Sequence, residues 1–133
     1  MKTDPQLHHT SVKIVQGSLE SVIHVFELLG CQVFYRHPSG QSVMVGQHAV
    51  PLFDIQLTEV QQQPQDNQHK VYSHVAFISE DPAAKIEAVE VWAKENKIAF
   101  TRGGWSEREL WFDLPDLFVD FVIEVMHVSI TEE

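Results

Sequence analysis

Four polar side chains occupy matching positions in two similar halves of the sequence, and together they have the chemistry of a metal site. His9 and His74 stand 65 residues apart, near the start of each half, and Gln56 and Glu124 stand 68 residues apart, near the end of each half. Two imidazoles and one carboxylate that meet can hold a divalent metal and leave coordination positions open. Glu124 also lies in an apolar segment, where a carboxylate needs a cation or several donors.

Each of these residues has a structural alternative. A single histidine or glutamate on a strand is more often a hydrogen-bonded structural group than a ligand. Their joint placement in the two halves is what favours a site. The prediction of a metal site therefore depends on the side chains of His9, His74 and Glu124 lying close together in one pocket.

The elements that must position these residues form two β-α-β-β-β repeats. The first repeat, about residues 7–60, is predicted to contain a helix over 18–29, begun by Ser18, and strands over 9–15, Gln32–Arg36, Ser42–Val45 and Leu52–Glu59. The second, about residues 71–128, is predicted to contain a helix from Asp81-Pro82, a turn at Gly103-Gly104, and strands over Val71–Ile78, Ala99–Arg102, Arg108–Asp113 and Val119–Val125. The polar residues 61–70 are predicted to link the repeats on the surface of a single domain, 1–133.

Strand alternation sorts the side chains onto two faces. His9, Ser11 and Lys13 are predicted to oppose Val12 and Ile14, so His8 should point away from His9. Gln56 and Glu124 are likewise predicted to lie on the polar face of their strands. An apolar face packs under helices, and the polar face lines a concave surface of the kind that binds ligands.

Composition excludes several classes of protein. The chain has 133 residues, of which 44% are hydrophobic, and a formal net charge of −10. This predicts one globular domain and no nucleic-acid partner, because no basic cluster is present to neutralise phosphates. We expect no membrane association and a cytoplasmic protein, since neither a secretion signal nor a spanning apolar segment is present in these residues.

Three segments give the chain a resemblance to a known family. Leu7-His8-His9-Thr10, Tyr72-Ser73-His74-Val75-Ala76 and Ile123-Glu124-Val125, within the double β-α-β-β-β plan, resemble the vicinal oxygen chelate superfamily. That group includes glyoxalase I, fosfomycin-resistance enzymes, extradiol dioxygenases and bleomycin-binding proteins. The resemblance implies an α+β fold in which a curved mixed sheet forms a half-open barrel with the helices outside.

The resemblance also implies a metal site and a class of reaction. The implied ligands are His9, Gln56, His74 and Glu124, holding Ni, Co, Mn, Fe or Zn, with Glu124 also catalytic. The implied function is a metal-dependent lyase, isomerase or dioxygenase that acts on a small oxygen-bearing substrate. Gln56 argues against strict glyoxalase I activity, because a neutral amide cannot accept a proton as a carboxylate does.

An alternative from another class stays open. The same concave surface could bind a drug-like compound without any metal, as bleomycin-resistance relatives do, with aromatic side chains supplying the affinity. In either case Ser11, Lys13, Tyr35 and Trp111 are the predicted substrate-binding residues. The resemblance further implies a homodimer.

Overall fold

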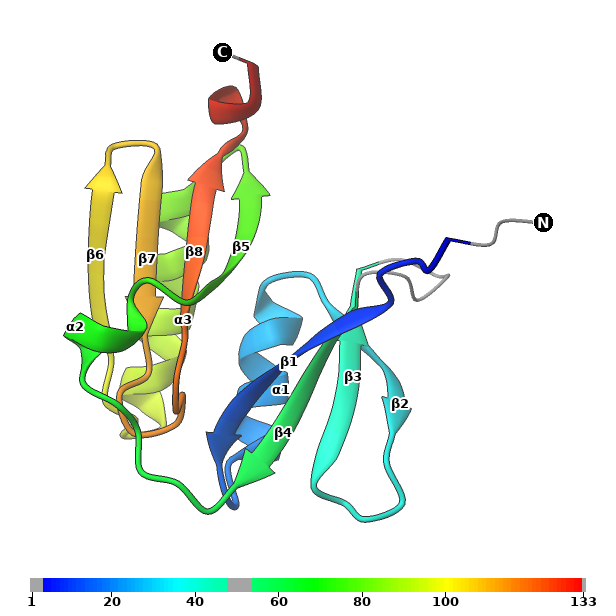
Figure 1. The fold of residues 1–133 in the computed structure, drawn as a ribbon. Coiled ribbons are helices and arrows are strands. Elements are labelled where there is room, and N and C mark those ends of the chain that lie inside the picture. Colours follow the sequence, from blue (N-terminus) through cyan, green and yellow to red (C-terminus); the bar gives the residue numbers. More distant parts are fainter. Residues whose placement is uncertain (1–3, 48–53, 133) are drawn as a thin grey trace. The chain divides into compact units, whose positions relative to one another are not determined.

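The protein consists of two compact units, each built from one four-stranded mixed sheet and one long helix. A computed structural model describes residues 4–47 and 54–132. The chain divides between Val60 and Gln61, and Figure 1 shows the two sheets with their strands labelled. Each unit follows the order β-α-β-β-β, which confirms the predicted repeats and the α+β class.

The first unit has its elements close to the predicted positions. It contains β1 (His9–Val15), α1 (Leu19–Leu28), β2 (Gln32–Arg36), β3 (Ser42–Gly46) and β4 (Asp54–Val60), with sheet order β1-β4-β3-β2. β1 and β4 are parallel, and the other pairs are antiparallel. The predicted start of the last strand, Leu52, lies outside the described residues.

The second unit repeats this sheet and adds two short helices. It contains α2 (Asn67–Lys70), β5 (His74–Ser79), α3 (Pro82–Glu95), β6 (Thr101–Ser106), β7 (Glu109–Asp113), β8 (Val122–His127) and the 3₁₀ helix η1 (Val128–Glu132). The sheet order is β5-β8-β7-β6, and β5 and β8 are again the parallel pair. In the part of the chain that the structure describes, no helix has the length and apolar character needed to cross a bilayer.

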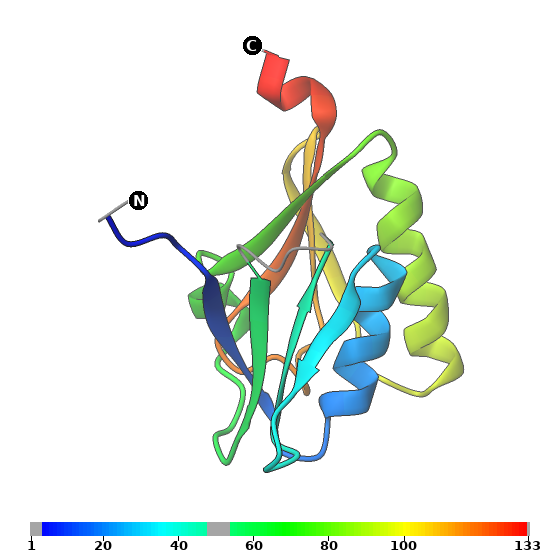
Figure 2. The same cartoon turned by 90° about the vertical axis from the view of Figure 1, so that its right-hand side faces the viewer.

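In each unit the long helix covers one face of the sheet. Figure 2 shows the course of the two helices from the side. α1 buries Val22, Ile23 and Phe26, and α3 buries Ile86, Val89 and Ala93. These residues recur every three or four positions, as an amphipathic helix requires. The opposite face of each sheet is therefore not covered by the long helix of its unit.

The two helices begin differently. The Asp81 carboxylate accepts a hydrogen bond from the backbone N–H of Ala84 at 3.1 Å, as the sequence predicts. Ser18 is the N-cap residue of α1, as predicted, but its side chain does not cap the helix, because its hydroxyl donates to the carbonyl of Val15. The Glu59 carboxylate, 40 residues away, accepts from the N–H of Leu19 at 2.9 Å instead.

Two strand boundaries differ from the prediction because of packing. The predicted Gly103-Gly104 turn is wrong, since β6 continues through both glycines to Ser106. A Cβ on Gly103 would lie 2.5 Å from Cζ2 of Trp111, so the missing side chain makes room for an indole. Val71, predicted to open a strand, is instead the residue that directly follows α2, and its N–H donates to the carbonyl of Asn67.

A buried ion pair fastens α2 to the sheet. Lys70 Nζ lies 3.0 Å from the Asp113 carboxylate, and both side chains are fully buried. Lys70 Nζ also donates to the carbonyl of Phe118 at 2.6 Å, and Asn67 Nδ2 donates to Asp113 at 3.0 Å. The predicted surface linker thus ends in a helix whose last residue is in the core, and Figure 1 shows α2 beside one end of β7.

We expect Lys70→Met to lower the free energy of unfolding by about 3–5 kcal/mol, because it leaves the charge of Asp113 buried without a partner. Urea denaturation followed by circular dichroism measures this. The double variant Lys70→Met/Asp113→Leu should recover much of the loss. Arg36→Met, which removes the exposed pair with Glu20, is the control and should change stability little. Equal losses in Lys70→Met and Arg36→Met would contradict the assignment.

Candidate functional site

The predicted ligands hold equivalent positions in the two sheets. On the parallel pair β1 and β4, His9 is opposite Asp54, so Gln56 lies two residues further along the same face. On the parallel pair β5 and β8, His74 is opposite Val122, and Glu124 again lies two residues further along. The repeat therefore extends to strand register, and each sheet places one histidine and one Gln or Glu on the face away from its helix.

In the second unit the two side chains face each other. His74 Nε2 lies 3.7 Å from Glu124 Oε1. His74 Nδ1 lies 3.4 Å from the carbonyl oxygen of Val71, which can only accept, so in the neutral ring the proton is on Nδ1. Nε2 then presents a lone pair towards a carboxylate. A proton or a metal cation between these two acceptors would stabilise the arrangement.

Glu124 is also buried, which makes it costly to leave its carboxylate without a partner. Glu124 is 6% exposed. Burial raises the pKa of its carboxyl above the ordinary value of 4.5, Glu109 also raises it, and His74 opposes them by favouring the charged form. Glu124 therefore holds a proton more tightly than an exposed glutamate does, which makes it a stronger base when it is ionised.

In the first unit the equivalent residues have other partners. His9 Nδ1 lies 3.0 Å from Nδ1 of His8, with the rings edge to face. The prediction that His8 points away from His9 is wrong, because His8 precedes β1 and is not bound by strand alternation. Gln56 Nε2 donates to the hydroxyl of Ser42 at 3.4 Å.

The predicted substrate-binding residues of this unit are exposed on the strands. Ser11 is the register partner of Gln56, and its hydroxyl lies 3.0 Å from that of Thr58. Lys13 is exposed on the same face. Tyr35 is exposed on β2, with its ring edge against His37. Within the described part of each unit, no group of three or more His, Cys, Asp or Glu residues gathers, so the roles assigned to these residues stay predictions.

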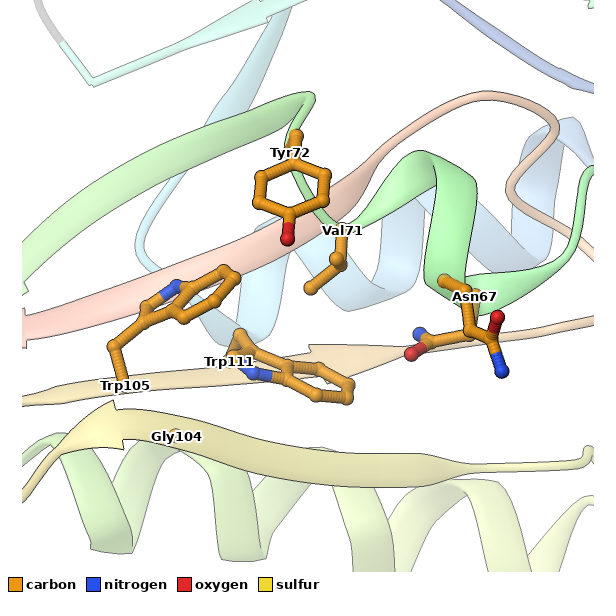
Figure 3. Close-up of a pocket in the computed structure, with 7 residues that line it drawn as sticks. Asn67, Val71, Tyr72, Gly104, Trp105 and Trp111 are labelled. Atoms are coloured by element: carbon orange, nitrogen blue, oxygen red, sulfur yellow. The ribbon is translucent and has the colours of Figure 1, made fainter.

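The second unit contains a pocket of about 510 Å³ on the sheet face opposite α3. Asn67 and Gln68 of α2 line it, together with Val71 and Tyr72 that follow. Gly104, Trp105 and Trp111 of β6 and β7 complete the lining. Figure 3 shows Val71 and Tyr72 pointing towards the two indoles.

The position of Trp111 explains the shape of this pocket. Trp111 pairs with Gly103 across β6 and β7, and its indole covers the space that a side chain at Gly103 would need. Trp111 also pairs with Glu124 across β7 and β8, so the indole and the carboxylate project from one face at neighbouring strand positions. Trp111, a predicted substrate-binding residue, thus lies between the pocket and the His74–Glu124 pair.

Sequence reasoning missed most of the pocket. Asn67 and Gln68 lie in a polar segment that the sequence predicts to be a surface link, and the sequence pattern predicts Tyr72 to lie in a strand. One signal was available for Asp113, an acidic residue between the apolar Phe112 and Leu114. Such a residue requires a buried cation, but the sequence does not indicate that Lys70 supplies it.

Comparison with known proteins identifies the fold. No family model and no curated protein matches the sequence. Among solved structures, the fosfomycin resistance protein FosX from Mesorhizobium loti is 13% identical, with 99% of this chain and 98% of that chain covered at a TM-score of 0.58. A glyoxalase/dioxygenase from Nostoc punctiforme is 21% identical, with 96% of each chain covered at 0.56. TnmS3, an antibiotic binding protein from Streptomyces sp. CB03234, is 16% identical, with 96% and 98% covered at 0.50.

The chain has the vicinal oxygen chelate fold. The predicted resemblance is thereby confirmed for the fold, over almost the whole of the chain and of the matched structures. Proteins with the vicinal oxygen chelate fold include both enzymes and binding proteins, so the activity of this chain must be argued from its own residues.

We expect Glu124→Gln to raise the melting temperature of chelator-treated protein at pH 8, because an amide has no charge to desolvate. A carboxyl with a raised pKa in the folded state stabilises the fold as pH falls and loses that contribution as pH rises through the folded-state pKa. The advantage of the variant should therefore shrink as the pH approaches 4.5. Thermal denaturation from pH 4.5 to 8 measures it. Glu107→Gln, at an exposed turn, is the control, and the same pH trend in both variants would contradict this account.

We expect Gly103→Ala to lower the free energy of unfolding by about 1–3 kcal/mol, because the new Cβ overlaps the rigid indole of Trp111. Thermal denaturation and tryptophan fluorescence detect the loss and the displaced ring. Gly104→Ala is the matched control and should cost less, since its Cβ would meet the end of the flexible Leu110 side chain at 3.0 Å and the backbone oxygens of Ser106 and Glu109 at 3.3 Å, all longer than the 2.5 Å contact at Gly103. A larger loss in Gly104→Ala would show that Trp111 is not held against Gly103.

Proposed function

We propose that this protein is a metal-dependent enzyme that acts on a small oxygen-bearing substrate. The observation that carries the proposal is the His74–Glu124 pair, two acceptors 3.7 Å apart on the sheet face opposite α3. Ligands of one first-row metal lie about 2.0–2.2 Å from it, and so roughly 3–3.5 Å from each other. The pair is close to this spacing and has the donor types that such metals prefer.

His9 and Gln56 are proposed to complete the ligand set. They hold the register positions in the first sheet that His74 and Glu124 hold in the second. Ni, Co, Mn, Fe and Zn all accept this mixture of imidazole and oxygen donors. The carbonyl of Val71 fixes the ring of His74 so that Nε2 is the ligand atom, a common arrangement for metal-binding histidines.

The proposed chemistry uses Glu124 as a base beside the metal. The metal, when bound, supplies Lewis acidity that stabilises negative charge developing on a substrate oxygen. Glu124 accepts a proton at its carboxylate, and its burial strengthens it as a base. The amide of Gln56 cannot do the same, so we propose a lyase, isomerase or dioxygenase reaction rather than that of glyoxalase I. The similarity in fold to FosX and to a glyoxalase/dioxygenase supports this range, and we further propose that the protein works as a homodimer.

We expect chelator-treated protein to bind one Co(II), Ni(II), Mn(II), Fe(II) or Zn(II) ion per chain in isothermal titration calorimetry. His74→Ala and Glu124→Gln should each weaken binding by at least about tenfold, the loss that even an outer partner of a metal ligand can cause. Binding should weaken at low pH, where protons compete for both side chains.

His24→Ala, on the exposed face of α1, is the control for this titration and should bind the ion as the unaltered protein does. His9→Ala tests the contribution of the first unit. The absence of stoichiometric binding for all five ions would overturn the proposal.

A further inference from the structure

The pocket beside Trp111 has the lining of a site for a flat ring system. Its volume of about 510 Å³ lies within the range of small-molecule sites and accommodates a two-ring compound. Three of the seven residues that line it are aromatic, namely Tyr72, Trp105 and Trp111. Trp105 and Tyr72 are exposed although large and aromatic. Exposed aromatic side chains around a pocket can bury apolar surface when a ligand binds there.

The geometry of the three rings determines how such a ligand would lie. The ring centroids of Tyr72 and Trp105 are 5.8 Å apart with a tilt of 34°, so these rings contact each other and no third ring fits between them. They form one wall of the pocket (Figure 3). Trp111 lies over Gly103 on one side, which leaves its other side as the floor. A flat ligand would therefore stack on Trp111 with its edge against the wall.

The polar part of the lining favours a ligand without negative charge. Asn67 and Gln68 contribute neutral amides, and Asn67 is held in place by its hydrogen bond to Asp113. None of the described residues that line the pocket is basic. The chain also carries a net charge of −10, which repels anions.

The register links this pocket to the proposed metal site. Trp111 and Glu124 are direct partners on β7 and β8, so their side chains are neighbours on one face. The indole of Trp111 extends over Gly103 of β6, so only the β8 side of a ring stacked on it would point towards Glu124. An oxygen substituent on that side would point towards the groups proposed to hold the metal, which do not themselves line the pocket.

We infer that the substrate is a flat, uncharged aromatic compound of about two rings with an oxygen substituent at its edge, stacked on Trp111 against Tyr72 and Trp105. This inference rests on the proposed function for its chemistry, but ligand binding at the pocket does not require the metal. Stacking on the three aromatic residues supplies the affinity, and the edge oxygen supplies the orientation.

The test uses 2-naphthol as the probe, titrated into the chelator-treated protein by calorimetry. We expect saturable binding with one site per chain. Decahydro-2-naphthol, which has the same oxygen without flat rings, and naphthalene-2-sulfonate, which is anionic, should each bind more weakly. Trp105→Ala and Tyr72→Ala should weaken 2-naphthol binding about two- to tenfold, the usual contribution of an aromatic pair.

Val91→Ala is the matched control, because Val91 on α3 is 48% exposed and Trp105 is 47% exposed, so both substitutions remove an exposed apolar side chain. The inference is overturned if 2-naphthol does not bind, if its saturated analogue binds as well, or if Val91→Ala loses as much affinity as Trp105→Ala. Metal binding is measured separately without the probe. If 2-naphthol binds and no metal binds, the inferred ligand site stands and the proposal of a metal-dependent enzyme is overturned. If a metal binds and 2-naphthol does not, the proposed metal site stands and the inferred ligand is overturned.

Discussion

The buried ion pair between Lys70 and Asp113 is the interaction on which the second unit depends. Two opposite charges in the core require each other, and here they also require α2 to lie against the end of β7. Asn67 adds a hydrogen bond to the same carboxylate, so the residue that anchors the helix also lines the pocket. Because Val71 directly follows this helix, its carbonyl lies within reach of His74. The pocket and the orientation of the proposed ligand thus follow from one buried charge pair.

The two repeats share a register but differ in what they build on it. Both place a histidine on an edge strand and a longer polar residue two positions further along on the parallel strand beside it. In the second sheet the histidine and glutamate face each other, and a tryptophan lies beside the glutamate. In the first sheet the equivalent residues contact His8 and Ser42. The two units therefore share a backbone frame and differ in the polar contacts made on it.

Gly103 shows how a missing side chain can create a binding surface. The sequence Gly103-Gly104 is typical of a turn, and local propensity alone predicts one there. In the folded sheet the indole of Trp111 occupies the space above Gly103. The benefit of burying a large aromatic surface outweighs the loss of a side chain in the strand. The result is a flat aromatic floor next to the buried carboxylate of Glu124.

The sequence by itself determined the order of elements, the two repeats and the face on which His9, Gln56 and Glu124 lie, because these follow from hydrophobic periodicity and alternation along the chain. The resemblance of three short segments to the vicinal oxygen chelate superfamily implied the fold class. Only the tertiary structure decided which residues line the pocket, that Lys70 is buried, that Glu59 caps α1 and that β6 runs through Gly103. These features join residues that are distant in the sequence, such as Lys70 with Asp113 and Leu19 with Glu59. Local patterns carry no information on such partners, since the partner is chosen by packing and by charge compensation in the folded chain.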